Sequence, residues 1–217
     1  MGIAQLDKEK GLLLIKAHII LYGDAASSEL ARQVAGEIET YWTMPRATVL
    51  IKGNIYTVVF NITAESNPSL QPEEIFENDN PLLNYFRVEE YSSMDISFVD
   101  GLGSNTGYFK LLNLANNSTT AAHEFGHTIG LDHPKNLDIR GQGAPGIMYP
   151  RGTLVDRDYQ YDPAAPAGAI GGTMNPAHRT VRQKDIEDLR LHKLSFDQNN
   201  RAVVGGFSSI WHRKHTQ

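Results

Sequence analysis

The chain has 217 residues, which suits one globular domain, or one domain with a cleft between two lobes. Its net charge of −5 gives no reason to expect nucleic acid or an anionic membrane as a partner, and no apolar run approaches the roughly 20 residues that span a bilayer. The absence of cysteine excludes disulfides, a thiolate nucleophile and a cysteine-ligated metal.

The first elements predict a sheet with a helix packed on it. Residues 11–22 are apolar and lie between two glycines, which is typical of a buried strand. Asp24 or Ser27 can cap the helix that follows, and Pro45 marks its end. Apolar residues recur along this helix every four positions and form one apolar stripe. The residues of the stripe are Leu30, Val34 and Ile38.

A hairpin and a long loop are expected next. Residues 48–51 and 55–62 are predicted to be strands joined by a tight turn at Gly53 and Asn54. Residues 64–90 are rich in proline and in acidic side chains, so they are interpreted as a surface loop that includes at most a short helix.

Three short segments lead from this loop toward the middle of the chain. Residues 94–98 alternate in polarity and predict a strand. Residues 100–107 are rich in glycine and in side-chain oxygens; a plain loop is the favoured interpretation, and a calcium (Ca²⁺) site is the alternative. Residues 107–112 predict another strand, and if it lies at the sheet edge its free backbone groups could pair with an extended peptide.

The most informative stretch is the run 118–133, STTAAHEFGHTIGLDH. If Ser118 caps a helix there, His123 and His127 lie four residues apart on one face, where two imidazole nitrogens can bind the same zinc ion. Glu124 is turned away from that face by roughly a third of a turn. It is therefore badly placed as a ligand and well placed to reach a water molecule on the open side of the metal.

A glycine and a third histidine complete this motif. Gly130 can adopt the positive φ that ends a helix, so that the chain doubles back and brings His133 to the metal as a third nitrogen ligand. Three neutral ligands and a water molecule describe a catalytic site rather than a closed structural one. The alternative interpretation, an ordinary half-buried helix with two histidines, does not account for the glycine and the third histidine at their fixed offsets.

The chain after the motif changes in character. Residues 134–180 show no periodicity and hold many prolines and glycines, which is typical of long functional loops. Residues 181–194 return to a helical pattern. The tail from Ser195 is mostly polar, and its basic stretch 212–215 is expected to be solvated.

The run from His123 to His133 resembles the signature of the metzincin zinc peptidases, and its wording is closest to that of the matrix metalloproteinases. These families place a methionine in a tight turn beneath the zinc. Two methionines suit this role, and Met148 is favoured over the alternative Met174 because its surroundings, Gly-Ile-Met-Tyr-Pro, are nearer to the matrix-metalloproteinase wording. Neither has a tyrosine two residues later, so the resemblance implies no tyrosine ligand.

The resemblance implies a zincin-like α+β fold. Residues 1–133 would form an upper lobe, with a twisted five-stranded mixed sheet, packed helices and the active-site helix. Residues 134–217 would form a smaller lower lobe with one helix, and the two lobes would make a single catalytic domain with the substrate between them. The chain departs from the family pattern at two places, so the side-chain preference of these peptidases is not carried over to it. Pro134 replaces the serine usual in matrix metalloproteinases, and the insertion 151–171, which has no counterpart, is expected to shape the specificity pocket.

The motif and the resemblance together predict a zinc-dependent endopeptidase that acts on an extended protein or peptide. Glu124 would be the general base. The alternative is a catalytically silent zinc-containing module that binds protein. We expect a monomer that is secreted or delivered outside the producing cell, as a toxin or effector module would be, although no signal peptide is recognisable. The predicted ligands of Zn²⁺ are His123, His127 and His133.

Overall fold

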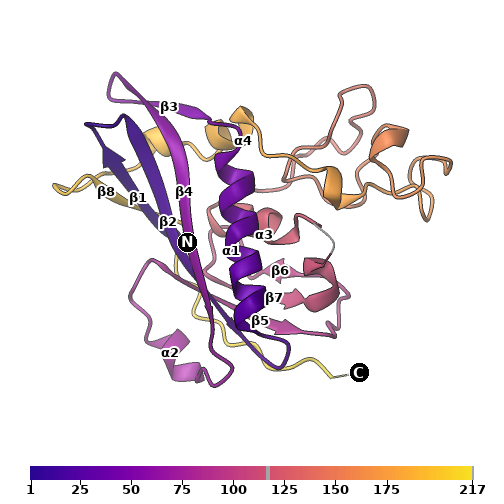
Figure 1. The fold of residues 1–217 in the computed structure, drawn as a ribbon, viewed down its shortest axis with the longest axis horizontal. Helices are drawn as coiled ribbons and strands as arrows, with labels where there is room; N and C mark the ends of the chain where they lie inside the picture. Colours follow the sequence, from indigo (N-terminus) through magenta and orange to yellow (C-terminus); the bar gives the residue numbers. More distant parts are fainter. Residues whose placement is uncertain (116–117, 217) are drawn as a thin grey trace.

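The computed structural model describes residues 1–115 and 118–216, which form one curled mixed β-sheet with helices packed against it (Figure 1). The main path of the sheet has the order β3-β4-β2-β5-β7-β6, and β1 and β8 continue it beside β2. The predicted α+β class is thereby confirmed. The strands are β1 (Gly2–Asp7), β2 (Leu12–Tyr22), β3 (Thr48–Ile51), β4 (Asn54–Ser66), β5 (Leu83–Glu89), β6 (Phe98–Val99), β7 (Thr106–Lys110) and β8 (Arg201–Val204).

Over the described residues the sheet has eight strands, not the five that were predicted. The neighbours β4, β2, β5 and β7 run parallel, and β6 pairs with β7 in the antiparallel sense. Antiparallel pairing adds β3, β1 and β8 to this group. β1 and β8 were not predicted, because they have only six and four residues, so that their alternating patterns are too short to stand out from loop sequence.

The central strand is β2, whose neighbours explain its long apolar sequence. β4 pairs with it from Leu12 to Leu21 along one edge. On the other edge, β1 pairs with its first half and β5 with its second half. A strand with neighbours on both edges and side chains buried on both faces reads as a continuous apolar run. The prediction of a buried strand at 11–22 is confirmed.

Helix α1 (Ser28–Thr43) packs on the sheet against β4 (Figure 1). Of the two predicted caps, Ser27 is the one used: its hydroxyl accepts a hydrogen bond from the backbone N–H of Leu30 at 3.1 Å. The remaining helices are short. They are α2 (Pro72–Phe76), α3 (Thr120–Thr128) and α4 (Gln183–Asp188), with 3-10 turns at Leu111–Leu114, Arg157–Tyr159, Pro176–His178 and Leu191–Lys193.

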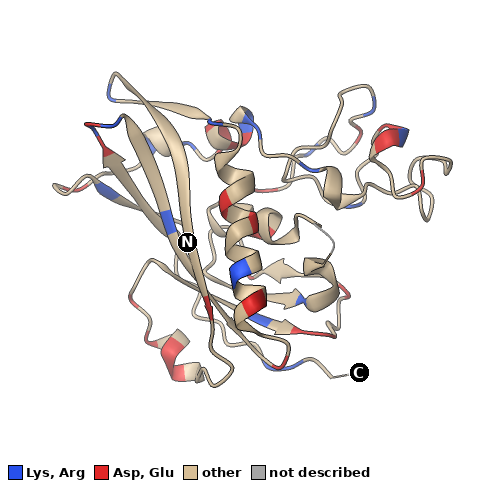
Figure 2. Ribbon diagram, viewed as in Figure 1, with Lys and Arg blue, Asp and Glu red and all other residues tan. Residues whose placement is uncertain are grey.

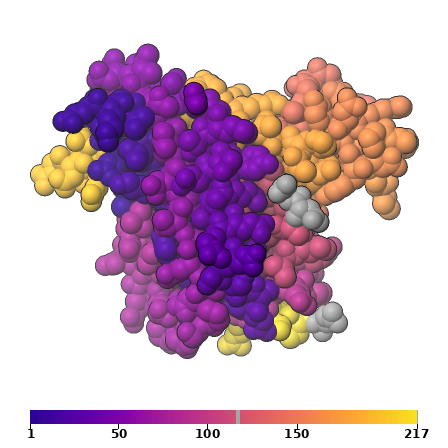
Figure 3. Space-filling model, viewed as in Figure 1, coloured from indigo at the N-terminus to yellow at the C-terminus, as the bar shows by residue number. Residues whose placement is uncertain are grey.

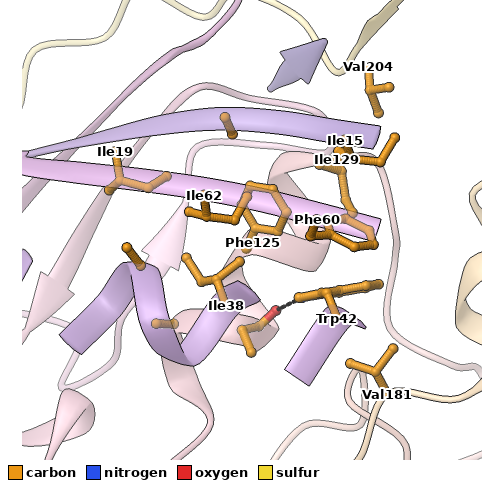
Figure 4. Packing of buried hydrophobic residues seen from close by; sticks show 14 of the residues in the cluster. Ile15, Ile19, Ile38, Trp42, Phe60, Ile62, Phe125, Ile129, Val181 and Val204 are labelled. Carbon is orange, nitrogen blue, oxygen red and sulfur yellow. Dashed lines mark hydrogen bonds between the residues drawn. The ribbon is translucent and has the colours of Figure 1, made fainter. Parts of the chain in front are cut away.

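A buried aromatic cluster joins α1, β4 and α3 (Figure 4). The ring of Trp42 lies 5.4 Å from that of Phe60 and 6.3 Å from that of Phe125, centre to centre. Phe60 and Phe125 meet edge to face at 6.2 Å, an arrangement that aromatic pairs favour. Trp42 Nε1 also donates a hydrogen bond to the carbonyl of Ala122 at 2.9 Å. The cluster therefore fixes α3, which carries the histidine motif, against the sheet.

Three local predictions need correction. Residues 64–90 are not all loop, because β5 lies within them; its side chains are buried on both faces, so it lacks the alternation that marks a half-exposed strand. The strand predicted at 94–98 is reduced to β6, since Ile96 and its predecessors are unpaired. The hairpin turn falls at Lys52 and Gly53, whose φ angles of 48° and 83° give a type I′ turn one residue earlier than predicted.

The segments within 134–217, predicted to form the lower lobe, differ in structure. Residues 134–180 project to one side of the sheet as a loop-rich unit (Figures 1 and 3). α4 is shorter than the pattern at 181–194 predicted, because Arg190 adopts a left-handed φ of 51°. β8 then pairs with β1, so the end of the chain returns to the sheet.

The C-terminal tail contacts the sheet, and within its basic stretch Arg213 and Lys214 are exposed, as predicted, whereas His212 and His215 are partly buried. Trp211 stacks on Tyr22 with ring centres 4.7 Å apart. His212 Nε2 lies 2.9 Å from both carboxylate oxygens of Asp100. Lys214 pairs with Asp24 and lies 4.0 Å from Glu89. Apolar stacking and ion pairs hold this segment.

Along the ribbon of Figure 2, acidic and basic positions are interspersed over the described elements. Within the described chain, none of the helices has both the length and the apolar character needed to cross a membrane.

Candidate metal centre

Three histidines converge at α3 and the turn that follows it. The Nε2 atoms of His123 and His133 are 3.1 Å apart, and those of His127 and His133 are also 3.1 Å apart. Nitrogens bound to one tetrahedral zinc ion at about 2.0–2.1 Å lie about 3.3 Å from each other, so the three rings are spaced as ligands of a single ion. The structure thus brings all three predicted ligands together; among the described residues no other such group of His, Asp and Glu side chains forms.

Backbone carbonyls orient two of these rings. His123 Nδ1 donates to the carbonyl of Ile147 at 2.7 Å, and His127 Nδ1 donates to the carbonyl of Leu131 at 2.7 Å. A carbonyl oxygen only accepts, so the proton of each neutral ring is on Nδ1. The Nε2 atoms therefore direct lone pairs toward the meeting point of the three rings, which is the tautomer a metal requires.

The electrostatics of the three rings suit a cation rather than protons. Burial lowers the pKa of His123 well below its ordinary value. Burial is also the main reason why the pKa values of His127 and His133 are lowered. Neutral imidazoles whose lone pairs face one another at 3.1 Å repel unless a positive ion lies between them. The residues present thus fit a metal ion with nitrogen ligands.

The first turn of α3 is built differently from the prediction that Ser118 caps it. Thr119 adopts a left-handed φ of 57°, so the helix begins at Thr120 and Ser118 lies one position too far out. The Ser118 hydroxyl accepts only a 3.3 Å bond from the N–H of Thr120. Glu37 of α1 supplies the cap instead, and its carboxylate accepts from the N–H of Ala122 at 3.2 Å. A carboxylate at a helix N-terminus is favourable for the helix dipole.

The turn after α3 is as predicted. Gly130 has a φ of 104°, which side chains other than glycine rarely adopt. The N–H of Leu131 bonds back to the carbonyl of Gly126 at 2.9 Å and closes the helix end. This reversal carries His133 back over the helix to the other two rings.

Glu124 is buried next to the histidines but is not one of the converging donors. Only 6% of its surface is exposed, and that part lines the same cavity as the three rings. Burial raises the pKa of Glu124 to about 8, and the positive charge of Arg179 opposes this shift. A carboxylate in this position can exchange a proton with a molecule held at the metal side of the cavity.

The cavity is a groove of about 470 Å³ beside the histidines. One wall is the segment from Ile96 to Leu102, which contains β6. The edge strand here is β6 and not the segment 107–112, because β7 lies between β5 and β6 in the sheet. The strand that could pair with an extended peptide is therefore β6, and not β7 as the prediction for residues 107–112 required.

The two candidate methionines lie in different places. Met148 is buried in the main core, where its side chain packs so closely on Gly126 of α3 that an added Cβ would overlap its sulfur. Met174 is buried with Ile139 and Val155 in a separate cluster within the loop-rich unit. Only Met148 lies against the helix that carries His123 and His127.

The loop at residues 100–107, for which a calcium site was the alternative interpretation, makes hydrogen bonds within the protein. Both carboxylate oxygens of Asp100 lie 2.9 Å from His212 Nε2, and one also accepts from the hydroxyl of Thr106. This carboxylate is therefore taken up by contacts within the protein. The plain-loop interpretation agrees with the contacts, and nothing in the described part of the chain adds support for Ca²⁺.

Sequence reasoning missed two arginines that line the groove, Arg151 and Arg179. Arg151 opens the insertion 151–171 and donates from Nη2 to the side chain of Asn113 at 3.2 Å. It is the part of the insertion that lines the groove. Arg179 follows the 3-10 turn Pro176–His178 and is buried. Neither could be singled out beforehand, because 134–180 has no periodicity that shows which side chains point inward.

Comparison with models of known protein families gives no match to this chain. No curated protein matches it significantly in sequence.

Proposed function

We propose that this chain is a zinc-dependent endopeptidase of the metzincin type. The observation that carries the proposal is the arrangement of four side chains in one groove: three imidazoles converge through Nε2, and the carboxylate of Glu124 lies beside them without joining the donor set. A site that serves only structure has no need of a buried carboxylate next to an open metal position.

The chemistry of the donors favours zinc. Three neutral imidazoles in tetrahedral spacing, with one position left open, are the usual ligand set of hydrolytic zinc. When bound, zinc supplies a Lewis acid that polarises the scissile carbonyl and lowers the pKa of a coordinated water molecule toward about 7.

Glu124 has the role of general base. In its ionised form it accepts the proton of the attacking water and passes it to the amine that leaves when the peptide bond breaks, and a pKa raised to about 8 makes that form a stronger base than an ordinary carboxylate. Its burial keeps bulk water from competing for that proton. Glu37 and Trp42 hold the helix that carries it, through the backbone of Ala122, so the carboxylate keeps its position relative to the three rings.

The substrate is proposed to be a polypeptide in extended form. β6 is the last strand of the main path and forms one wall of the groove, so its outer backbone groups can pair with an added strand. Pairing through the backbone accepts many sequences, as an endopeptidase requires. The short length of β6 limits this pairing to a few residues on either side of the cleaved bond.

Two further features support the metzincin assignment. β4, β2, β5, β7 and β6 form a five-stranded mixed subset of the sheet, with the antiparallel strand at the edge beside the histidines. Met148 lies beneath α3, which favours it over Met174 as the methionine of the turn below the zinc. The zincin-like arrangement of two lobes around the groove is part of the same proposal.

The test is a digest of a proteome-derived peptide library by the zinc-replete chain, with and without a chelator. We expect cleavage within peptides that stops on chelation and returns when zinc is added. A chain that binds one zinc ion and leaves every peptide and casein intact would favour the alternative, a zinc-containing module that binds protein without cleaving it.

A further inference from the structure

Arg179 is a buried positive charge in the wall of the groove. Only 4% of its surface is exposed, and that part faces the groove lined by His123 and Glu124. It lies in the loop-rich unit, directly after the 3-10 turn Pro176–His178. Thr119, at the start of α3, donates to the carbonyl of Pro176 at 2.8 Å and fixes this turn beside the helix. The position of Arg179 is therefore set by the same helix that carries the metal motif.

The guanidinium of Arg179 lacks the partners that such a group normally has. Its Nε atom is buried and has no hydrogen-bond partner among the described residues. Glu124 is the negative charge that most affects its pKa, yet the two side chains form no ion pair within the described chain. Buried arginines are usually paired with a carboxylate or a phosphate, because an isolated buried charge is unfavourable. The guanidinium is thus left without an acceptor inside the described part of the protein, and since Nε itself is buried, a ligand in the groove meets the exposed part of the side chain instead.

The group stays charged at neutral pH. Burial lowers the pKa of Arg179 to about 10, which still leaves it protonated at pH 7. The second arginine of the wall, Arg151, differs from Arg179 in two ways: it is exposed, and its guanidinium already donates a hydrogen bond to Asn113. Both arginines line the groove, whose acidic lining residues are Glu124 and Asp132, and a positive side chain in its wall favours a negative group of the ligand beside it.

We propose that Arg179 is a specificity residue that binds a carboxylate of the substrate, so that the groove prefers an aspartate or glutamate side chain next to the scissile bond. The inference rests on the proposed peptidase function. The planar guanidinium can donate hydrogen bonds to both oxygens of a carboxylate in a bidentate pair, and the amide of Gln or Asn, with one oxygen and no charge, cannot form that pair. A site whose buried donor is left unpaired discriminates strongly against the ligand that lacks the acceptor.

Paired peptides test the proposal. Each pair differs only by Glu against Gln, or Asp against Asn, at one position flanking a cleaved bond found in the library digest. The wild type should cleave the acidic member with a kcat/KM about 10- to 100-fold higher. In Arg179→Gln this preference should fall to about one, and Arg179→Lys should retain only part of it. The exposed Arg157, outside the groove, gives the matched control Arg157→Gln, which should keep the full preference.

A binding measurement makes the test independent of turnover. Fluorescently labelled peptides of each pair are titrated into Glu124→Gln and into Glu124→Gln/Arg179→Gln, with zinc content and circular dichroism checked for both. The acidic peptide should bind the first variant at least tenfold more tightly, and the second variant should show no difference. Peptides with a free and with an amidated C-terminus distinguish a side-chain carboxylate from a terminal one, and tighter binding of the free-terminus peptides alone would overturn the side-chain assignment.

The outcomes separate this inference from the function it rests on. Cleavage by the wild type with no preference for the acidic members would overturn the role of Arg179 and leave the peptidase function intact. An equal loss of kcat for acidic and neutral peptides in Arg179→Gln, with unchanged binding, would also overturn it, since Arg179 would then act through Glu124. Absence of any cleavage by the zinc-replete wild type would instead contradict the proposed function.

Discussion

His123 Nδ1 donates a 2.7 Å hydrogen bond to the carbonyl of Ile147, the residue immediately before Met148. One contact thus joins a predicted zinc ligand to the loop that passes beneath α3. Such outer contacts hold a ligating ring in its orientation and tune its basicity. The loop therefore helps to orient a zinc ligand on the helix, and mutations in the loop should weaken zinc binding.

The first prediction compares the two methionines. Met148→Ala should destabilise the metal-free chain by about 2–5 kcal/mol, because it leaves a cavity under α3. It should also weaken zinc binding by about tenfold or more, since the loop that orients His123 loses its packing. Met174→Ala should destabilise the chain without changing zinc affinity, because Met174 packs within another cluster. Urea unfolding and competition with a zinc chelator measure the two effects; equal affinities in Met148→Ala and the wild type would contradict the assignment.

The second prediction concerns the bond between Trp42 and Ala122. Trp42→Phe keeps most of the aromatic packing but removes the donor of a buried 2.9 Å hydrogen bond. It should lower the free energy of unfolding by about 1–3 kcal/mol, because a buried carbonyl loses its partner. Trp211→Phe is the control, since Trp211 is partly exposed and acts by stacking on Tyr22. Unfolding followed by circular dichroism would contradict the prediction if the two variants lost the same stability.

The third prediction is a dependence of stability on pH through Asp185. Its carboxylate accepts from the N–H of Arg182 at 2.7 Å in the first turn of α4, and burial raises the pKa of Asp185 to about 6 from an ordinary value of 3.8. A raised pKa means that the folded state favours the neutral acid. The stability contribution of this group is therefore fully present below pH 3.8 and is lost as the pH rises through about 6.

Asp185→Asn keeps an acceptor for Arg182 and removes the charge. The variant should gain stability relative to the wild type as the pH rises from 4 to 7.5, by at most about 3 kcal/mol. Urea unfolding of the metal-free chain at both pH values measures this difference. A gap between the two proteins that does not change with pH would show that burial of the charge has no net effect.

Much of the fold could be predicted where the signal is local. The strand at 11–22 and the helix after it follow from apolar residues, and the cap could be narrowed to Asp24 or Ser27, of which the structure uses Ser27. The convergence of three histidines was predictable as well, because helical spacing and one glycine, Gly130, determine it within eleven residues. β5 was missed since a strand buried on both faces has no alternation and lies here among prolines and acidic residues.

The remaining features of the site depend on contacts between distant segments. Glu37 reaches the first turn of α3 across 85 positions of sequence, and no local pattern marks it as a cap. Arg179 enters the groove from a stretch without periodicity, so its burial could not be inferred. His212 meets Asp100 across 112 positions, and no local pattern shows that this histidine of the basic stretch packs while Arg213 and Lys214 stay exposed. Residue spacing therefore predicts which side chains share one face of a helix, whereas the residues that contact this face from distant segments depend on the tertiary fold.

The most direct test of the whole account measures zinc content and peptide hydrolysis on the same samples of three proteins: the wild type, Glu124→Gln and His133→Ala. We predict one zinc ion per chain and chelator-sensitive cleavage in the wild type. Glu124→Gln should keep its zinc and lose activity by about 10²–10⁴-fold, because the proton acceptor is gone. His133→Ala should lose zinc affinity, since one of three ligands is missing. Full activity in zinc-replete Glu124→Gln, or a wild type that cleaves nothing while holding its zinc, would contradict the account.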